Sequence, residues 1–374
     1  MRISSQFDGG NIRVVSADES GDIRLKIRKD AGSAFYQWFY FRLSGAAGQL
    51  RRFVIENAGG AAYVGGWDGY EVCMSSDRET WSRVETRFED GRLVFETLIS
   101  DDAVWFAYFA PYSMERHATL IAVSQFSPRA RLDVIGETLD GRDMDRLIIG
   151  EPGAGKKTLW ITARQHPGET MAEWAAEGLI HRLLDDADPV PRDLLDRAVF
   201  HIVPNMNPDG SFRGHLRTNA KGVNLNREWD KASTENSPEV HCVLHEMAKT
   251  GVDLFLDMHG DEALPYNFIA GAEGVPGWTA DDQARLDAYK SALMAINPDF
   301  QVARGYPVNA PGKADLSIAT NWMRHHFGCL AMTLEMPFKD SAITPDEEEG
   351  WSPERSMKMG ASQLDAIRAV LDQL

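Results

Sequence analysis

The chain has 374 residues, of which 43% are hydrophobic and 25% are charged, and its formal net charge is −17. This length and composition are typical of a globular protein with room for two domains. The negative charge argues against nucleic acid and against anionic membrane surfaces as partners. The first residues lack the apolar stretch of a secretory signal, no apolar run is long enough to span a membrane, and Cys73, Cys242 and Cys329 have no paired spacing. We therefore expect a cytoplasmic protein without a disulfide framework.

Residues 1–112 contain short apolar and aromatic runs, separated by turns that are rich in glycine. The runs cover residues 12–15, 23–27, 34–43, 93–95 and 104–109. Short runs of this kind, without a long helical repeat, predict a small antiparallel β-sandwich domain over residues 1–112. The aromatic side chains could line a carbohydrate or peptide site, but we expect them to fill the core of the sandwich.

From Asp145 onward, the predicted strands and helices alternate. Apolar runs predict strands over residues 158–163, 198–203, 252–258 and 329–334. Helical periodicity predicts helices over residues 114–123, 169–185, 237–249, 279–295 and 353–373. Pro353 suits the first turn of the last helix. The alternation predicts a second domain of the α/β class, an α/β sandwich with a mostly parallel or mixed central sheet.

Polar residues collect at the carboxyl ends of the four predicted strands. The first strand is followed by His166 and Glu169, the third by His259, and the fourth by Glu335. The second strand runs into an asparagine-rich stretch, residues 204–210. In an open α/β sheet, ligands bind beyond the carboxyl ends of the strands. We therefore expect these side chains to meet at one edge of the sheet.

Two imidazoles and one carboxylate, from His166, His259 and Glu169, suit a single zinc ion with a fourth position open to water. Such an ion lowers the pKa of its bound water and polarises a carbonyl group. Glu335 is the candidate group that takes the proton of this water and delivers it to a leaving amine. A His-x-x-Glu pair alone often arises by chance in a solvated turn. The residues at the other strand ends make a hydrolytic zinc site the better interpretation.

The segment between residues 214 and 229 carries two arginines, Arg217 and Arg227. An arginine near a zinc ion can stabilise the oxyanion of a tetrahedral intermediate. Another arginine can bind a carboxylate through two parallel hydrogen bonds. In isolation, each of them would more often be a partner in a surface ion pair. Their position between the strand ends makes both candidates for the site.

Five motifs, in this order, resemble those of the zinc metallocarboxypeptidases. They are RQHPGET at 164–170, NPDG at 207–210, GVNLNREW at 222–229, DMHG at 257–260 and TLE at 333–335. Within that family the chain resembles the cytosolic carboxypeptidase subfamily, and in particular a bacterial member. The subfamily places a small β-sandwich before its catalytic domain, which agrees with the prediction for residues 1–112.

The resemblance implies a zinc-dependent exopeptidase that releases residues from the C-terminal tails of peptides or proteins. The three candidate ligands above would hold the zinc ion, and Glu335 would be the general base and acid. Arg217 would stabilise the oxyanion. Asn226 and Arg227 would bind the terminal carboxylate of the substrate. Residues 113–374 would form the catalytic domain.

Two positions depart from the pattern of the family. The family usually has Asp where this chain has Asn224, and that Asp orients a zinc-bound histidine. Because Asn still accepts a hydrogen bond but carries no charge, we expect a tuned site and not an abolished one. Where digestive relatives have a mobile tyrosine before the catalytic glutamate, this chain has Lys313, in a loop that also contains Tyr306. Either residue is a candidate for a substrate contact.

Eukaryotic members of the subfamily trim glutamates from acidic tails, so the resemblance suggests a preference for acidic C-terminal residues. Arg304, Lys313 and Arg324 are the basic candidates for such a subsite, and each could equally be an ordinary surface charge. One alternative function is a zinc amidohydrolase that deacylates a small N-acyl amino acid, which the pair of Asn226 and Arg227 would also suit. Another is an inactive module that binds acidic tails, and the intact ligand set with Glu335 argues against it.

Overall fold

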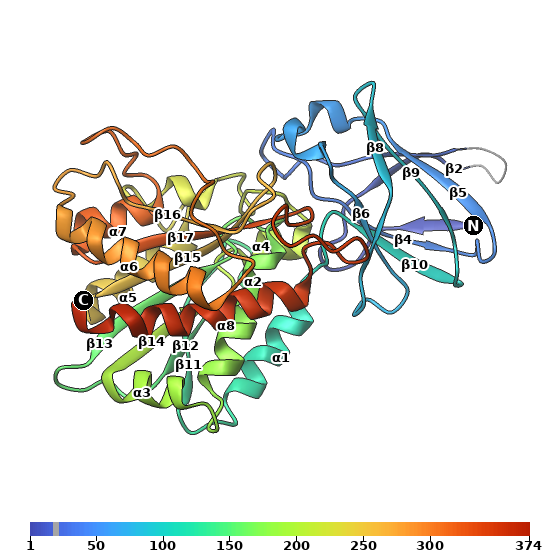
Figure 1. Cartoon of the computed structure of the whole chain (residues 1–374). Helices are drawn as coiled ribbons and strands as arrows, with labels where there is room; N and C mark the ends of the chain where they lie inside the picture. The colour runs from blue at the N-terminus through green and yellow to red at the C-terminus, as the bar shows by residue number, and fades with distance from the viewer. Residues whose placement is uncertain (18–21) are drawn as a thin grey trace.

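The computed structural model describes residues 1–17 and 22–374, which form two adjoining parts (Figure 1). The first part contains two five-stranded sheets. One sheet consists of β1 (Arg2–Ser4), β4 (Tyr40–Ser44), β10 (Ala103–Ala107), β6 (Val72–Ser75) and β7 (Ser82–Val84), in this spatial order. The other consists of β2 (Arg13–Ala17), β3 (Ile23–Lys26), β5 (Leu50–Ile55), β9 (Arg92–Leu98) and β8 (Thr86–Glu89). Two short 3₁₀ turns lie between β5 and β6, η1 (Ala58–Gly60) and η2 (Val64–Trp67).

Aromatic side chains fill the space between these two N-terminal sheets. Phe53 of β5 stacks on Phe95 of β9 at 4.6 Å between ring centroids, and it lies 4.8 Å from Phe106 of the facing sheet. All three rings are buried. The prediction that aromatic residues fill a sandwich core is confirmed. The pairing is antiparallel throughout, except that β3 and β5 run parallel, and the predicted run 34–43 is a strand only from Tyr40 onward.

The second part is built on a mixed seven-stranded sheet. Its strands, in spatial order, are β11 (Ala130–Glu137), β12 (Asp143–Ile149), β14 (Ala198–Val203), β13 (Lys157–Ala163), β15 (Leu254–Asp261), β17 (Leu330–Pro337) and β16 (Phe268–Gly271). The four predicted strands, β13, β14, β15 and β17, are neighbours and run parallel. The strands at the edges run antiparallel to their neighbours. The predicted fold class is confirmed.

Helices cover both faces of this central sheet (Figure 1). They are α1 (Met114–Ser124), α2 (Thr170–Leu183), α3 (Pro189–Arg197), α4 (Pro208–Arg213), α5 (Pro238–Thr250), α6 (Ala280–Ile296), α7 (Ala319–Phe327) and α8 (Pro353–Val370), with short 3₁₀ turns η3 (Leu225–Arg227) and η4 (Leu371–Gln373). In residues 1–17 and 22–374, no helix has the length and apolar character needed to cross a membrane.

The alternation of side chains along β13 explains the two helix layers. Leu159 and Ile161 point into the core that contains α2, α6 and α8, whereas Trp160 belongs to the core with α5 and α7. Helices α2 and α8 approach each other closely at two glycines. A Cβ atom at Gly178 would lie 2.1 Å from the Met357 carbonyl oxygen, and one at Gly360 would lie 1.8 Å from that of Ala175. Only glycine permits this approach.

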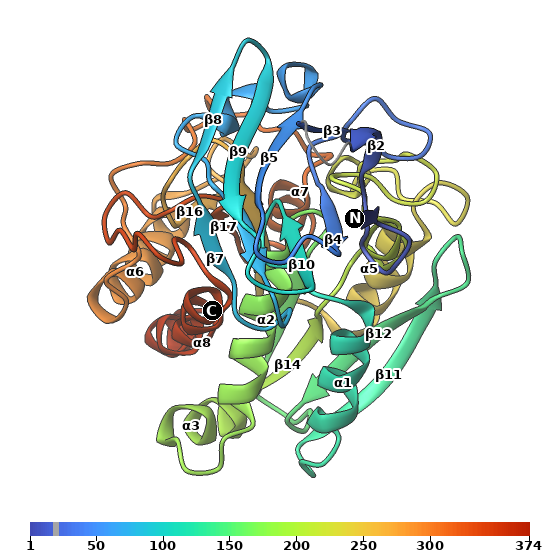
Figure 2. The same cartoon turned by 90° about the vertical axis from the view of Figure 1, so that its right-hand side faces the viewer.

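The N-terminal sheets lie beside the carboxyl ends of the central strands, as the two views together show (Figures 1 and 2). Tyr108, just after β10, stacks on Phe338, just after β17, with 4.5 Å between the ring centroids. Arg83 of β7 donates hydrogen bonds to the carbonyl oxygens of Phe338 and Trp351, at 3.0 and 2.8 Å. The first part therefore borders the edge of the sheet at which the predicted site residues lie.

Candidate active site

The turn between β13 and α2 is held in a fixed shape. Arg164 adopts the left-handed conformation, with φ at 58°. Gly168 donates a backbone hydrogen bond to the carbonyl oxygen of Leu216 at 2.9 Å, and a Cβ atom there would lie only 3.0 Å from that oxygen. Glu169 follows as the residue that precedes α2. His166 and Glu169 are therefore presented from one rigid strand-to-helix turn.

A buried polar network lies beneath this turn. Arg164 donates to the carbonyl oxygen of Tyr112 at 2.9 Å and to the carboxylate of Glu173 at 2.7 Å. The same carboxylate lies 2.7 Å from Nδ1 of His117, and Nε2 of His117 lies 3.2 Å from Asp145. Burial alone would lower the pKa of His117, but the two carboxylates outweigh it and raise the pKa to about 9. His117 is therefore a buried cation at neutral pH.

We expect this cation to make the stability of the protein sensitive to alkaline pH. An unfolded histidine has a pKa of about 6.5, so the stabilisation is complete below that pH and disappears as the pH rises through about 9. The free energy of unfolding should fall by about 2–3 kcal/mol over this window. Urea unfolding across the window measures the change, and His117→Gln should remove it. An unchanged slope in the variant would contradict the assignment.

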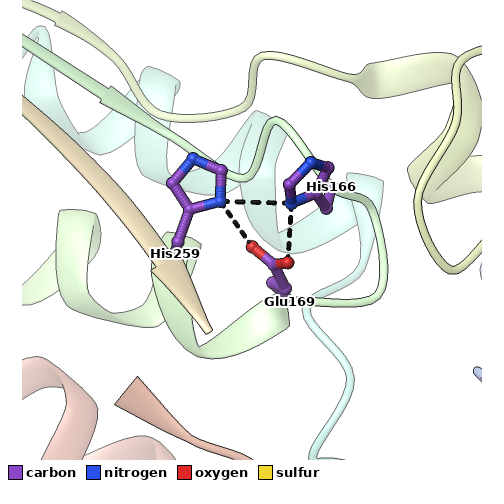
Figure 3. A group of neighbouring side chains, drawn as sticks. All are labelled: His166, Glu169 and His259. Carbon is purple, nitrogen blue, oxygen red and sulfur yellow. Dashed lines mark hydrogen bonds and ion pairs between the residues drawn. The ribbon is translucent and has the colours of Figure 1, made fainter. Parts of the chain in front are cut away.

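His166, Glu169 and His259 meet with their polar atoms pointing toward one another (Figure 3). The two carboxylate oxygens of Glu169 each lie 2.7 Å from an Nδ1 atom, Oε1 from that of His166 and Oε2 from that of His259. The two Nδ1 atoms are 3.2 Å apart. All three side chains are buried. The structure thus brings together the three residues that the sequence predicted as metal ligands.

This donor set fits zinc. Zinc–nitrogen bonds of about 2.0–2.1 Å allow two ligand nitrogens to lie at most about 4 Å apart, and the Nδ1 atoms of His166 and His259 meet that limit. Two imidazoles and one carboxylate leave a coordination position for water, as in catalytic zinc sites. Burial and the charge of Arg217 lower the pKa of His166 to about 4, so its imidazole is neutral, which is the form that binds a metal.

The outer nitrogens of both imidazoles are anchored. His259 donates from Nε2 to the carboxylate of Asp257 at 2.7 Å, and Asp257 also accepts from the Thr162 hydroxyl at 2.7 Å. His166 donates from Nε2 to Oδ1 of Asn224 at 3.1 Å. Such partners fix the ring orientation and the tautomer of a metal-binding histidine. Asn224 therefore keeps the orienting hydrogen bond without a charge, whereas Asp257, which the sequence reading missed, supplies a charged partner.

Glu335 lies next to the three candidate ligands. It pairs in register with His259 on the neighbouring parallel strand. It is 7% exposed, and among the described residues its Oε2 atom has no hydrogen-bond partner. Burial raises the pKa of this carboxyl well above its usual range, and the charge of Glu169 raises it further. A buried carboxyl oxygen without a partner, beside a metal-ligand set, is placed to exchange a proton with a bound molecule.

Arg217, Asn226 and Arg227 line the same cavity as the ligand set. Arg217 Nη1 lies 3.9 Å from the carboxylate of Glu169. Asn226 accepts a hydrogen bond at Oδ1 from the backbone of Ala319 at 2.8 Å, so its Nδ2 group is the one that can donate to a ligand. The cavity has a volume of about 420 Å³, and all seven predicted site residues line it.

The structure separates the remaining candidates. Tyr306 lines the cavity, and its hydroxyl donates a hydrogen bond to Asp261 at 2.6 Å. Lys313 is exposed and is not among the described residues that line the cavity. Arg304 is exposed, and Arg324 forms an ion pair with Asp282. In the part of the chain that the structure describes, neither arginine is among the residues that line the cavity. Lys290 of α6 lines the cavity together with Arg217 and Arg227. This lysine was not among the candidates named from the sequence. Lys290 lies in none of the five motifs, so no signal in the sequence points to it.

Comparison with protein families matches most of the chain. A family model described as cytosolic carboxypeptidase N-terminal domain matches residues 3–109, and one described as zinc carboxypeptidase matches residues 117–356. Cytosolic carboxypeptidase 6 of Mus musculus is 27% identical over 71% of this chain and 54% of its own length. Human cytosolic carboxypeptidase 1 is 27% identical over 64% of this chain and 23% of its own length. The chain spans about half or less of these two curated relatives.

Two bacterial structures match the chain from end to end. A metallo-carboxypeptidase from Burkholderia cenocepacia has 47% identity and a TM-score of 0.97, with 100% of both chains covered. A metallo-carboxypeptidase from Pseudomonas aeruginosa has 44% identity and a TM-score of 0.97, also with 100% of both chains covered.

The chain belongs to the zinc carboxypeptidase family, and it is a zinc-dependent metallocarboxypeptidase. Within the family, its first part and its relatives place it with the cytosolic carboxypeptidases. Zinc is the metal of the family.

Proposed function

We propose that the protein removes single residues from the C-termini of peptides or protein tails. The observation that carries the proposal is the convergence on one cavity of a zinc-type ligand set, a buried carboxyl and two groups that suit a carboxylate. An endopeptidase does not need a carboxylate-binding pair beside its metal site. A C-terminal exopeptidase does, because each of its substrates ends in a free carboxylate.

In this proposal, Arg227 and Asn226 bind the terminal carboxylate and so place the last peptide bond beside Glu335. Arg227 can offer two parallel hydrogen bonds from its guanidinium, and Asn226 can add one from Nδ2. This placement explains why the bond to be cleaved is the terminal one. It also turns binding energy into orientation of the reacting groups.

Glu335 is proposed as the general base and acid. Its carboxylate takes a proton from the attacking water and then delivers a proton to the amine that leaves. The guanidinium of Arg217 stabilises the negative charge that develops on the carbonyl oxygen. When bound, zinc supplies Lewis acidity that lowers the pKa of water and polarises the carbonyl. His166, Glu169 and His259 are proposed as its ligands, with Asn224 and Asp257 orienting the two imidazoles.

The proposed preference for acidic C-terminal residues depends on Lys290. The ammonium group of Lys290 lies 3.6 Å from the carboxylate of Glu273, which also lines the cavity. A substrate carboxylate could replace Glu273 as the partner of Lys290. A basic side chain could instead pair with Glu273, and the related structure from Pseudomonas aeruginosa holds (2-guanidinoethylmercapto)succinic acid, a ligand with a guanidino group. The preference therefore depends on whether the side chain of the substrate pairs with Lys290 or with Glu273.

Peptides that are identical except for a C-terminal Glu, Leu or Lys test both parts of the proposal. With zinc-loaded protein, mass spectrometry should show stepwise loss of single C-terminal residues, with Glu released about tenfold faster than Leu. Lys290→Ala should remove this advantage, with Glu273→Gln as the matched control that retains it. Equal rates for all three peptides would reject the acidic preference, and faster release of Lys would assign the subsite to Glu273. Loss of residues from the N-terminus instead would reject the proposed C-terminal exopeptidase.

The alternative deacylase is not favoured, because the first part of the chain matches a domain of the cytosolic carboxypeptidases and small-molecule deacylases of the superfamily tend to lack such a domain. We further propose that the domain boundary lies at residues 112 and 113, between β10 and α1. A cytoplasmic location is proposed from the cytosolic relatives and from three buried cysteines that form no disulfide.

A further inference from the structure

One buried carboxylate of the N-terminal part, in the connection between β3 and β4, holds the loop that carries Arg217. Asp30 is 2% exposed. Its Oδ1 accepts from the backbone N–H of Leu216 at 2.7 Å, and its Oδ2 accepts from those of Arg217 and Thr218 at 2.9 and 3.0 Å. The Thr218 hydroxyl adds a fourth hydrogen bond at 3.0 Å. Three consecutive backbone donors thus converge on one side chain from a distant part of the chain.

Two further contacts fix the residues that come just before this loop segment, Gly214 and His215. The backbone N–H of Ala31 donates to Nε2 of His215 at 3.0 Å. Asn11 donates from Nδ2 to the carbonyl oxygen of Gly214 at 2.8 Å. The loop around Arg217 is therefore attached to the N-terminal part through its backbone and one side chain.

The tip of Arg217 is also covered by the N-terminal part. Its guanidinium carbon lies 5.3 Å from the centre of the Tyr63 ring and 5.8 Å from that of Phe35. Both distances are within the range of cation–π contacts. Nη1 of Arg217 also lies 3.9 Å from the carboxylate of Glu169. The guanidinium thus contacts two aromatic rings of the N-terminal part and one proposed zinc ligand, Glu169, of the other part.

We propose that Asp30 is a positioning residue for Arg217, and that the N-terminal sheets thereby complete the active site. The inference rests on the proposed role of Arg217 as oxyanion stabiliser. Asp30 does not line the cavity, so it acts through the backbone of residues 216–218. A donor aimed at a developing charge loses its effect when it is displaced by about 1 Å, which can lower the rate about a hundredfold. The sandwich is then a part of the catalytic machinery and not an appended module.

Asp30→Asn should lower kcat by about tenfold to a hundredfold, because an amide turns one acceptor into a donor that faces backbone N–H groups. KM should stay within about twofold, since Arg217 acts in the transition state. The decisive test is a double-mutant cycle with Arg217→Ala. In that background, Asp30→Asn should cost nothing further in kcat. The inference would be overturned if the losses of kcat in the two single variants multiply in the double variant. It would also be overturned if Asp30→Asn alone leaves kcat unchanged.

Asp77→Asn is the control, because the exposed Asp77 also accepts backbone N–H groups at 2.8 Å, but from Glu79 and Thr80 of its own turn and not from the Arg217 loop. It should leave kcat unchanged. If Asp30→Asn does not fold, Phe35→Leu is tested in the same cycle. A loss of about threefold in kcat that is absent in the Arg217→Ala background supports the inference. An unchanged kcat in Phe35→Leu overturns it. Wild-type turnover is recorded alongside. An active wild type with additive losses rejects this inference alone, and an inactive wild type rejects the proposed function with it.

Discussion

Glu335→Gln is expected to keep its zinc and to lose about 10³-fold in kcat. The amide has nearly the shape of the carboxyl but cannot take a proton from water or deliver one to an amine. Glu335 is not one of the three proposed zinc ligands, His166, Glu169 and His259. The zinc content of the variant, measured by elemental analysis, should therefore stay at one equivalent. Near-full activity in the variant would contradict the proposed mechanism.

Glu262→Gln is the matched control for this experiment. Glu262 is also a buried carboxyl that lines the same cavity, and burial raises its pKa well above the usual range, as it does for Glu335. If the loss in Glu335→Gln came only from a changed electric field in the cavity, both variants should lose activity to a similar extent. Proton transfer by Glu335 predicts a much smaller loss in Glu262→Gln.

The main features of the fold and the ligand set could be predicted because they depend on local patterns. Each central strand is a continuous apolar run that ends in polar residues, and parallel neighbours must place these ends together. His166, His259 and Glu335 follow directly from this rule, because they lie at the ends of β13, β15 and β17. The antiparallel edge strand β11 was missed because most of its residues are half-exposed and alternate irregularly, with a bulge between Val134 and Glu137.

Residues whose role depends on long-range contacts were not predicted. Asp30 is an ordinary turn residue in the sequence, and its hydrogen bonds reach residues 216–218 of the other part. Lys290 lies on a helix far from every motif. The candidates named from the sequence were instead Arg304, Lys313 and Arg324, because they are basic. Asp257 could have been found, since residues two apart on a strand share a face and Asp257 precedes His259 by two.

The second large effect concerns the metal itself. His259→Ala removes one of the two imidazoles that face Glu169, and it leaves Asp257 without the ring that it orients. A zinc site with one protein nitrogen and one carboxylate holds the ion far more weakly than a site with three ligands. We expect zinc content to fall well below one equivalent and turnover to fall with it.

The matched control is His201→Ala. His201 is also a buried histidine of the central sheet, but it stacks on Trp160 at 4.8 Å between ring centroids and is outside the grouped ligand residues. Its removal should lower stability, because it leaves a cavity in the core, and should leave zinc content at one equivalent. The comparison separates loss of a ligand from loss of a buried side chain.

Zinc stoichiometry, measured by elemental analysis after identical dialysis of the wild type, His259→Ala and His201→Ala, therefore tests the central claim most directly. The claim is that His166, Glu169 and His259 hold one ion together. It predicts one zinc per chain in the wild type and in His201→Ala, and little zinc in His259→Ala. One full equivalent of zinc in His259→Ala would remove His259 from the ligand set and contradict the account.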